Sequence, residues 1–132
     1  MTEPEKAPRT VPRGKTPDLE KMKSKGIAAF KEKRFKDADG LFRKALSIRD
    51  DKDVYLYLAY TQINLGQSSK AEKTLEKGLK AFPQEVRLYR IYAKYLASSG
   101  QTQKAVSIVK KGLQIAPDDS NLKFMNDYLK GR

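Results

Sequence analysis

Apolar residues recur at steps of three and four positions along most of the chain after residue 17, which is the spacing of one face of an α-helix. Residues 35–48 carry one such stripe, and no segment shows the sustained alternation that predicts a strand. Pro83 and Pro117 stand where helices should end. The pattern predicts seven helices, at residues 18–32, 36–49, 53–65, 68–81, 85–98, 102–115 and 120–129. Because the predicted connections are two to four residues long, successive helices must form antiparallel hairpins in an all-α fold.

The helical pattern repeats with spacings of 33 and 34 residues when the chain is aligned on Ala38, Ala71 and Ala105. Four positions after each alanine stands a large apolar residue, and seven positions after it stands a small residue followed by leucine. Twelve positions before each alanine is another small residue: Gly26, Ala59 and Ala93. Small residues let paired helices approach closely, and stacked hairpins hide the apolar surface that each hairpin leaves exposed. The repeats therefore predict close packing at these positions.

This arrangement of small and large residues resembles the tetratricopeptide repeat family, whose units contain two helices in 34 residues. The resemblance covers residues 19 to about 117 and implies a right-handed α-solenoid of antiparallel helix pairs. Its three units are expected at residues 19–51, 52–85 and 86–119, with a final helix at 120–129 that resembles the family's solvating cap. The sequence departs from the family at the first-helix tryptophan, which is replaced by Met22, Tyr55 and Tyr89.

Residues 1–17 differ from the rest, because they contain four of the six prolines and almost no large aliphatic side chain. Such a segment buries too little apolar surface to offset its ordering entropy, so we expect a disordered, proline-rich tail ahead of a domain at 18–132. The alternative is a docking or nucleic-acid-steering arm. Neither a secretory signal nor a membrane-spanning run of about 18 apolar residues is found, so a cytoplasmic protein is expected.

The resemblance implies that the first helix of each unit lines a concave groove, which holds a peptide or a helix of a partner protein. Helical offsets predict ten residues on this groove: Lys23, Ile27, Leu56, Tyr57, Tyr60, Asn64, Arg87, Arg90, Ile91 and Lys94. We expect Tyr57, Tyr60 and Ile91 to anchor a partner and the cations to steer its acidic groups. The alternative for the tyrosines is that they only pack between helices.

One branch of the family binds acidic C-terminal tails of heat-shock proteins with two lysines, two asparagines and an arginine. Lys23 and Arg87 supply cations at two of these five positions, but the other three hold Ile27, Tyr57 and Ile91. A carboxylate placed against isoleucine loses hydration without gaining a partner. An apolar segment with acidic flanks is therefore the expected partner.

The charge balance adds a second candidate surface, because 28 Lys and Arg against 16 Asp and Glu give a net charge of +12. Six lysines are predicted on the second helices of the last two units: Lys70, Lys73, Lys77, Lys80, Lys104 and Lys111. They form either a solvated face or a site for nucleic acid or another polyanion. Because the ends of a repeat array are exposed, self-association through these ends is a further expectation.

Catalysis is not expected from this sequence, which has no histidine and no cysteine. Histidine bases, cysteine nucleophiles and cysteine-based zinc sites are thereby excluded, and no phosphate loop or metal-ligand cluster is found. We expect no enzyme, no cofactor and no metal. The acidic residues at 50–53 and 118–119 are predicted to cap helices, because the glycine and distal glutamate of a calcium loop are missing.

Overall fold

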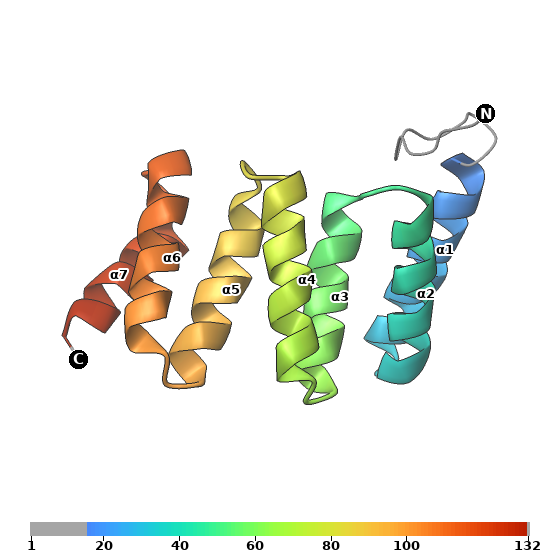
Figure 1. Cartoon of the computed structure of the whole chain (residues 1–132), viewed down its shortest axis with the longest axis horizontal. Helices are drawn as coiled ribbons and strands as arrows, with labels where there is room; N and C mark the ends of the chain where they lie inside the picture. The colour runs from blue at the N-terminus through green and yellow to red at the C-terminus, as the bar shows by residue number, and fades with distance from the viewer. Residues whose placement is uncertain (1–15, 132) are drawn as a thin grey trace. The chain divides into compact units, whose positions relative to one another are not determined.

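The computed structural model describes residues 16–131 and contains seven α-helices and no strand within them (Figure 1). The helices are α1 (Thr16–Lys31), α2 (Phe35–Ile48), α3 (Lys52–Asn64), α4 (Ser68–Ala81), α5 (Val86–Ser98), α6 (Thr102–Ile115) and α7 (Ser120–Lys130). The predicted all-α fold is confirmed, and every predicted helix boundary falls within two residues of the observed one. The predicted tail lies outside the described residues except for its last two, which begin α1. A proline in the first helical turn gives up no intrahelical hydrogen bond, so α1 can begin there.

The chain divides into two compact units, Met1–Thr74 and Leu75–Arg132, and the boundary falls inside α4. In the first unit α1, α2 and α3 pack against one another around a core of Leu19, Ala29, Ala38, Phe42, Ala45, Val54 and Leu58. Within this unit a buried hydrogen bond runs from the Thr74 hydroxyl, in the middle of α4, to the Gln62 side chain of α3. In the second unit α5, α6 and α7 pack against one another. There the Tyr92 hydroxyl of α5 donates to the Glu76 carboxylate of α4, at 3.1 Å.

The small-residue positions of the repeat bring the helices close together, as predicted. A Cβ atom at Gly26 would lie 2.5 Å from Cε1 of Phe42, whose side chain is fully buried. A Cβ atom at Gly112 would lie 2.7 Å from Cδ1 of Leu122 and 3.0 Å from Cβ of Tyr89. Real Cβ atoms do not approach this closely, so glycine is required where α1 meets α2 and where α6 meets its neighbours.

The turn inside each helix pair has one residue in the left-handed region, at Lys33 (φ 64°), Gly66 (φ 74°) and Gly100 (φ 81°). In each turn the N–H of the next residue donates to the carbonyl five residues back, at 2.8–2.9 Å. These bonds run from residue 34 to 29, from 67 to 62 and from 101 to 96. This bond closes the Schellman motif, which ends a helix and usually places glycine at the left-handed position. The first turn alone carries a residue with a Cβ atom there.

We expect Lys33→Gly to stabilise the protein by about 0.5–1 kcal/mol, because a non-glycine residue in the left-handed region costs about 1–2 kcal/mol, partly offset by the greater chain entropy of glycine. The Lys33 side chain is exposed, so its removal gives up little packing. Urea denaturation measures the difference, and Gly66→Ala is the matched control, expected to lower the midpoint. A lower midpoint for Lys33→Gly would contradict the strain.

Candidate functional site

A chain of aromatic contacts in the first unit leads from the core to the surface. Phe42 is fully buried on α2, and its ring stacks on that of Tyr57 with 5.9 Å between centroids. The ring of Phe30 on α1 meets Tyr57 edge-on at 5.3 Å and also meets Phe35 at 5.6 Å. Tyr60 ends the series, with its ring 6.3 Å from Phe30 and 41% of the residue exposed. The exposed ring is thus held by rings that are anchored in the core. We call Phe30, Tyr57 and Tyr60 the aromatic surface.

The predicted tyrosine anchors take different positions within this series. Tyr57 is half-buried and packs against the core of the first unit. Tyr60 is exposed and is the tyrosine that a partner can reach. Ile27 is half-buried against the same core, while Asn64 is exposed and donates from its side chain to the Tyr60 carbonyl at 2.8 Å.

Two predicted groove residues differ from expectation, because Leu56 is only 8% exposed and Ile91 only 4%. The expectation that Ile91 anchors a partner at the surface therefore needs correction. Helical spacing fixes the direction of a side chain around its helix, but it does not say how much of that helix is covered. Seven residues of α3 and six of α5 are buried, so both helices are covered on more than one side.

Lys23, a predicted groove cation, is held by carboxylates of the same unit. Its ammonium group lies 2.9 Å from Oδ2 of Asp53 and 3.3 Å from Oδ2 of Asp51. Partial burial by itself lowers the pKa of Lys23, but the two carboxylates outweigh it and leave the pKa raised. Asp51 also caps α3, because its Oδ1 accepts the N–H of Val54 at 3.0 Å. One carboxylate thus satisfies a helix end and a lysine from another helix.

The second unit repeats this arrangement with Arg90 and Asp119. Arg90 donates from Nε to Oδ2 of Asp119 at 2.8 Å and also from Nη2 to the same oxygen, while Oδ1 of Asp119 caps α7 at the N–H of Leu122. The hydrogen bonds from Arg90 hold the pKa of Asp119 below its usual value. Arg87 bonds Glu85 at 2.7 Å, and Lys94 is exposed.

The predicted cations therefore face carboxylates of their own chain at three of four positions, and the steering role expected of Lys23, Arg87 and Arg90 needs correction on that ground. The signal for this pairing was present in the sequence, because Asp51, Glu85 and Asp119 are spaced by 34 residues and each caps the helix that follows. Lys23 and Arg90 occupy the same position of the repeat, where the middle unit carries leucine.

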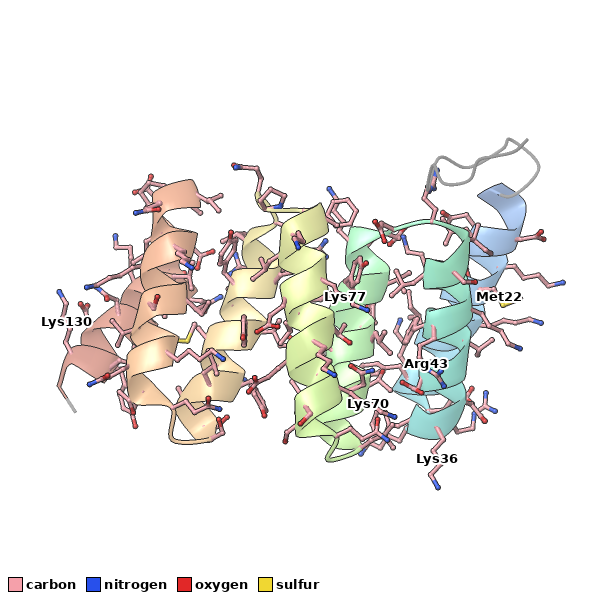
Figure 2. All side chains as sticks on the ribbon, in the orientation of Figure 1. Met22, Lys36, Arg43, Lys70, Lys77 and Lys130 are labelled. Carbon is pink, nitrogen blue, oxygen red and sulfur yellow. The ribbon has the colours of Figure 1, made fainter. Side chains whose placement is uncertain are left out.

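The six lysines of the predicted basic face are all exposed. Lys70 and Lys77 can be seen on α4 in Figure 2. On α6, the Lys104 ammonium lies 5.8 Å from the centroid of the Tyr92 ring, in a cation–π contact. Burial is the main cause that raises the pKa of Tyr92, which also bonds Glu76. Exposure of all six lysines is expected both for a solvated face and for a site that binds a polyanion.

Residues 16–131 contain neither a candidate metal site nor a membrane-spanning helix. No group of three or more acidic side chains is arranged there to bind a metal ion. None of the helices in the same range combines the length and apolar content needed to cross a bilayer.

The comparisons with known proteins agree with the fold. The chain belongs to the tetratricopeptide repeat family, since the family's sequence model matches residues 29–95, just over half of the chain. Seven helices correspond to three helix pairs and a capping helix. A search of curated protein sequences finds no significant match.

Solved structures of the same fold align over most of the chain. The tetratricopeptide repeat domain of Sgt2 from Aspergillus fumigatus gives a TM-score of 0.80 at 23% identity, over 95% of this chain and 83% of that one. The tetratricopeptide repeat domain of OM64 from Arabidopsis gives a TM-score of 0.77 at 22% identity, and the alignment covers 86% of this chain and 94% of that one. The type III secretion chaperone SycD from Yersinia enterocolitica was solved in complex with a peptide of the translocator YopD. It gives a TM-score of 0.78 at 18% identity, and the alignment covers 87% of this chain and 94% of that one. At these identities the likeness establishes the fold.

Proposed function

We propose that the chain is a non-catalytic protein-interaction module, which binds a peptide or an amphipathic helix of a partner protein at the aromatic surface of its first unit. The observation that carries the proposal is Tyr60, whose ring is exposed yet supported by Phe30 and, behind it, by Tyr57 and the buried Phe42. A supported ring loses little conformational entropy on binding, which is typical of an interface anchor. The YopD peptide bound by SycD supports a peptide partner by analogy of fold.

The chemistry of this surface favours an apolar partner segment with acidic flanks. Aromatic rings accept aliphatic or aromatic side chains, and the exposed Lys31 follows Phe30 directly on α1. A terminal carboxylate directed at Lys23 would have to displace Asp51 or Asp53, which already bind that ammonium group. The ion pairs of Lys23 thus add to the argument against a heat-shock-type carboxylate clamp.

We expect Tyr60→Ser to weaken partner binding about 30-fold, equivalent to about 2 kcal/mol, which is the size of an interface hot spot. The measurement is the dissociation constant of helical peptides selected from a library on the parent chain. Tyr128→Ser is the matched control, because Tyr128 is 54% exposed but lies on α7 of the second unit. Selected peptides that bind Tyr60→Ser as tightly as the parent would refute the proposed surface.

A second candidate function is the binding of a polyanion by the basic face, supported by the exposure of all six lysines. Such binding neutralises phosphates, so its affinity falls steeply as salt rises. Labelled single-stranded RNA, titrated at two salt concentrations, tests this candidate. Tight binding that survives Tyr60→Ser but is lost when Lys73 and Lys77 are changed to glutamate would favour it over the peptide-binding proposal.

A further inference from the structure

The outer face of α7 carries a pair of exposed aromatic rings. Leu122 and Leu129 are buried on the inner face, where α7 packs against α5 and α6. On the outer face Phe124 is 69% exposed and Tyr128 is 54% exposed, the two highest values among large apolar residues in the described range. Their rings are 6.3 Å apart and nearly parallel, at 13°. A solvating cap should present a polar outer face, so this helix differs from what the family resemblance implied.

Charged residues accompany the aromatic pair in a regular way. Lys123 directly precedes Phe124 and Asp127 directly precedes Tyr128, and all four side chains are exposed. Because successive helix residues are about 100° apart, the two charges form a row parallel to the two rings. The row has its cation towards the start of α7 and its anion towards the end. Within residues 16–131 no ion pair joins Lys123 to Asp127, although four positions separate them.

This order of residues is self-complementary under a two-fold axis. When two copies of α7 face each other antiparallel, Phe124 of one copy meets Tyr128 of the other, and Tyr128 meets Phe124. The two-fold axis passes between the two helices, perpendicular to both, and therefore keeps the charged rows of both copies on the same side. Lys123 of each copy then comes next to Asp127 of its counterpart. One contact thus covers four rings and makes two ion pairs.

We propose that the outer face of α7 binds a second copy of the chain, in an antiparallel α7–α7 contact centred on Phe124 and Tyr128. The exposed fractions correspond to about 250 Å² of aromatic surface in each copy, since a Phe or Tyr side chain covers about 150–250 Å². The pair buries about 500 Å² of it, below the roughly 1,200–2,000 Å² of stable interfaces, so the dimer is weak and forms at high concentration. This contact is separate from the aromatic surface of the first unit.

The first test is sedimentation of the full chain from about 10 μM to about 1 mM, the range in which a weak contact forms. A monomer–dimer equilibrium is expected for the parent, and Phe124→Ser should raise its dissociation constant at least about 10-fold. Tyr60→Ser is the control and should leave the equilibrium unchanged, which separates this proposal from the peptide-binding one. A parent that stays monomeric at the highest concentration, or a Phe124→Ser variant that dimerises equally well, overturns the proposal.

The second test addresses the antiparallel geometry through charge. Lys123→Glu creates two facing pairs of acids, and Asp127→Lys creates two facing pairs of lysines, so each variant alone should dimerise about 10-fold more weakly. An equal mixture of the two variants restores opposite charges at both pairs, and its heterodimer should form as tightly as the parent. If the mixture dimerises no more tightly than either variant alone, the proposed antiparallel contact is refuted. Loss of selected-peptide binding in Phe124→Ser would also overturn it, by assigning this face to a different protein.

Discussion

Replacing Gly26 by alanine is expected to lower the unfolding free energy by about 1–2 kcal/mol. The new methyl group would lie 2.5 Å from the Phe42 ring, and that ring is fully buried and stacked on Tyr57, so it has no free space to move into. Overpacking of this kind costs about 1–3 kcal/mol, and the better helix propensity of alanine returns up to about 1 kcal/mol. Urea denaturation followed by circular dichroism measures the net loss.

Gly40→Ala on α2 is the matched control for this prediction, because a Cβ atom at residue 40 meets nothing within 4 Å. The same substitution should therefore stabilise the chain there, by up to about 1 kcal/mol. Phe42→Leu removes ring atoms from the clash, so Gly26→Ala should cost less in that background, as a double-mutant cycle would show. Equal effects at residues 26 and 40 would contradict the close approach of α1 and α2.

Asp119→Ala is expected to destabilise the second unit by about 2–3 kcal/mol. About 1 kcal/mol comes from the lost cap of α7, and the remainder from the hydrogen-bonded pair with Arg90, reduced because the arginine is partly exposed. Asp119→Asn separates these contributions, because an asparagine at this position still caps the helix. The denaturation midpoint should therefore be highest for the parent, lower for Asp119→Asn and lowest for Asp119→Ala. An alanine variant as stable as the asparagine variant would exclude a capping role.

The charge contribution of Asp119 also has a predicted pH dependence. Arg90 holds the folded pKa of this carboxylate below the ordinary value of 3.8, so the folded state binds the proton less readily than the unfolded state. The stabilisation is therefore complete above the ordinary pKa and is lost as the pH falls through the lower, folded pKa. The difference in unfolding free energy between the parent and Asp119→Asn should be constant near pH 7 and should disappear below about pH 4. A difference that persists in acid would show that the charge is not its source.

The sequence predicted the helices and their close packing because both depend on local chemistry. Apolar residues at helical spacing identify each helix, and prolines such as Pro83 lie in the connections as expected. The recurrence of small residues predicted the approach at Gly26, which the distance to Phe42 confirms. A residue type that recurs in phase with the repeat reports a packing requirement, since each unit meets its neighbours in the same way.

The burial of side chains was harder to predict than the positions of the helices, because burial depends on which face of a helix packs against another helix. The last helix carries two apolar rows, one with Leu122 and Leu129 and the other with Phe124 and Tyr128. Spacing alone does not show that the first row is buried and the second exposed. The same limit explains Ile91, which has the phase of a groove residue but is 4% exposed. The choice of carboxylate by a given cation likewise depends on tertiary proximity.

The packing partners of each helix have a consequence for how the chain folds. Within each unit, helices pack against those that directly precede or follow them in the chain, or against the next one along. The ion pairs of Lys23 and Arg90 reach only 28 to 30 residues ahead. Native contacts of such short range require little loop closure before they form, so the contact order of each unit is low. Folding can therefore nucleate at any helix pair and spread to its neighbours without waiting for a distant segment of the chain.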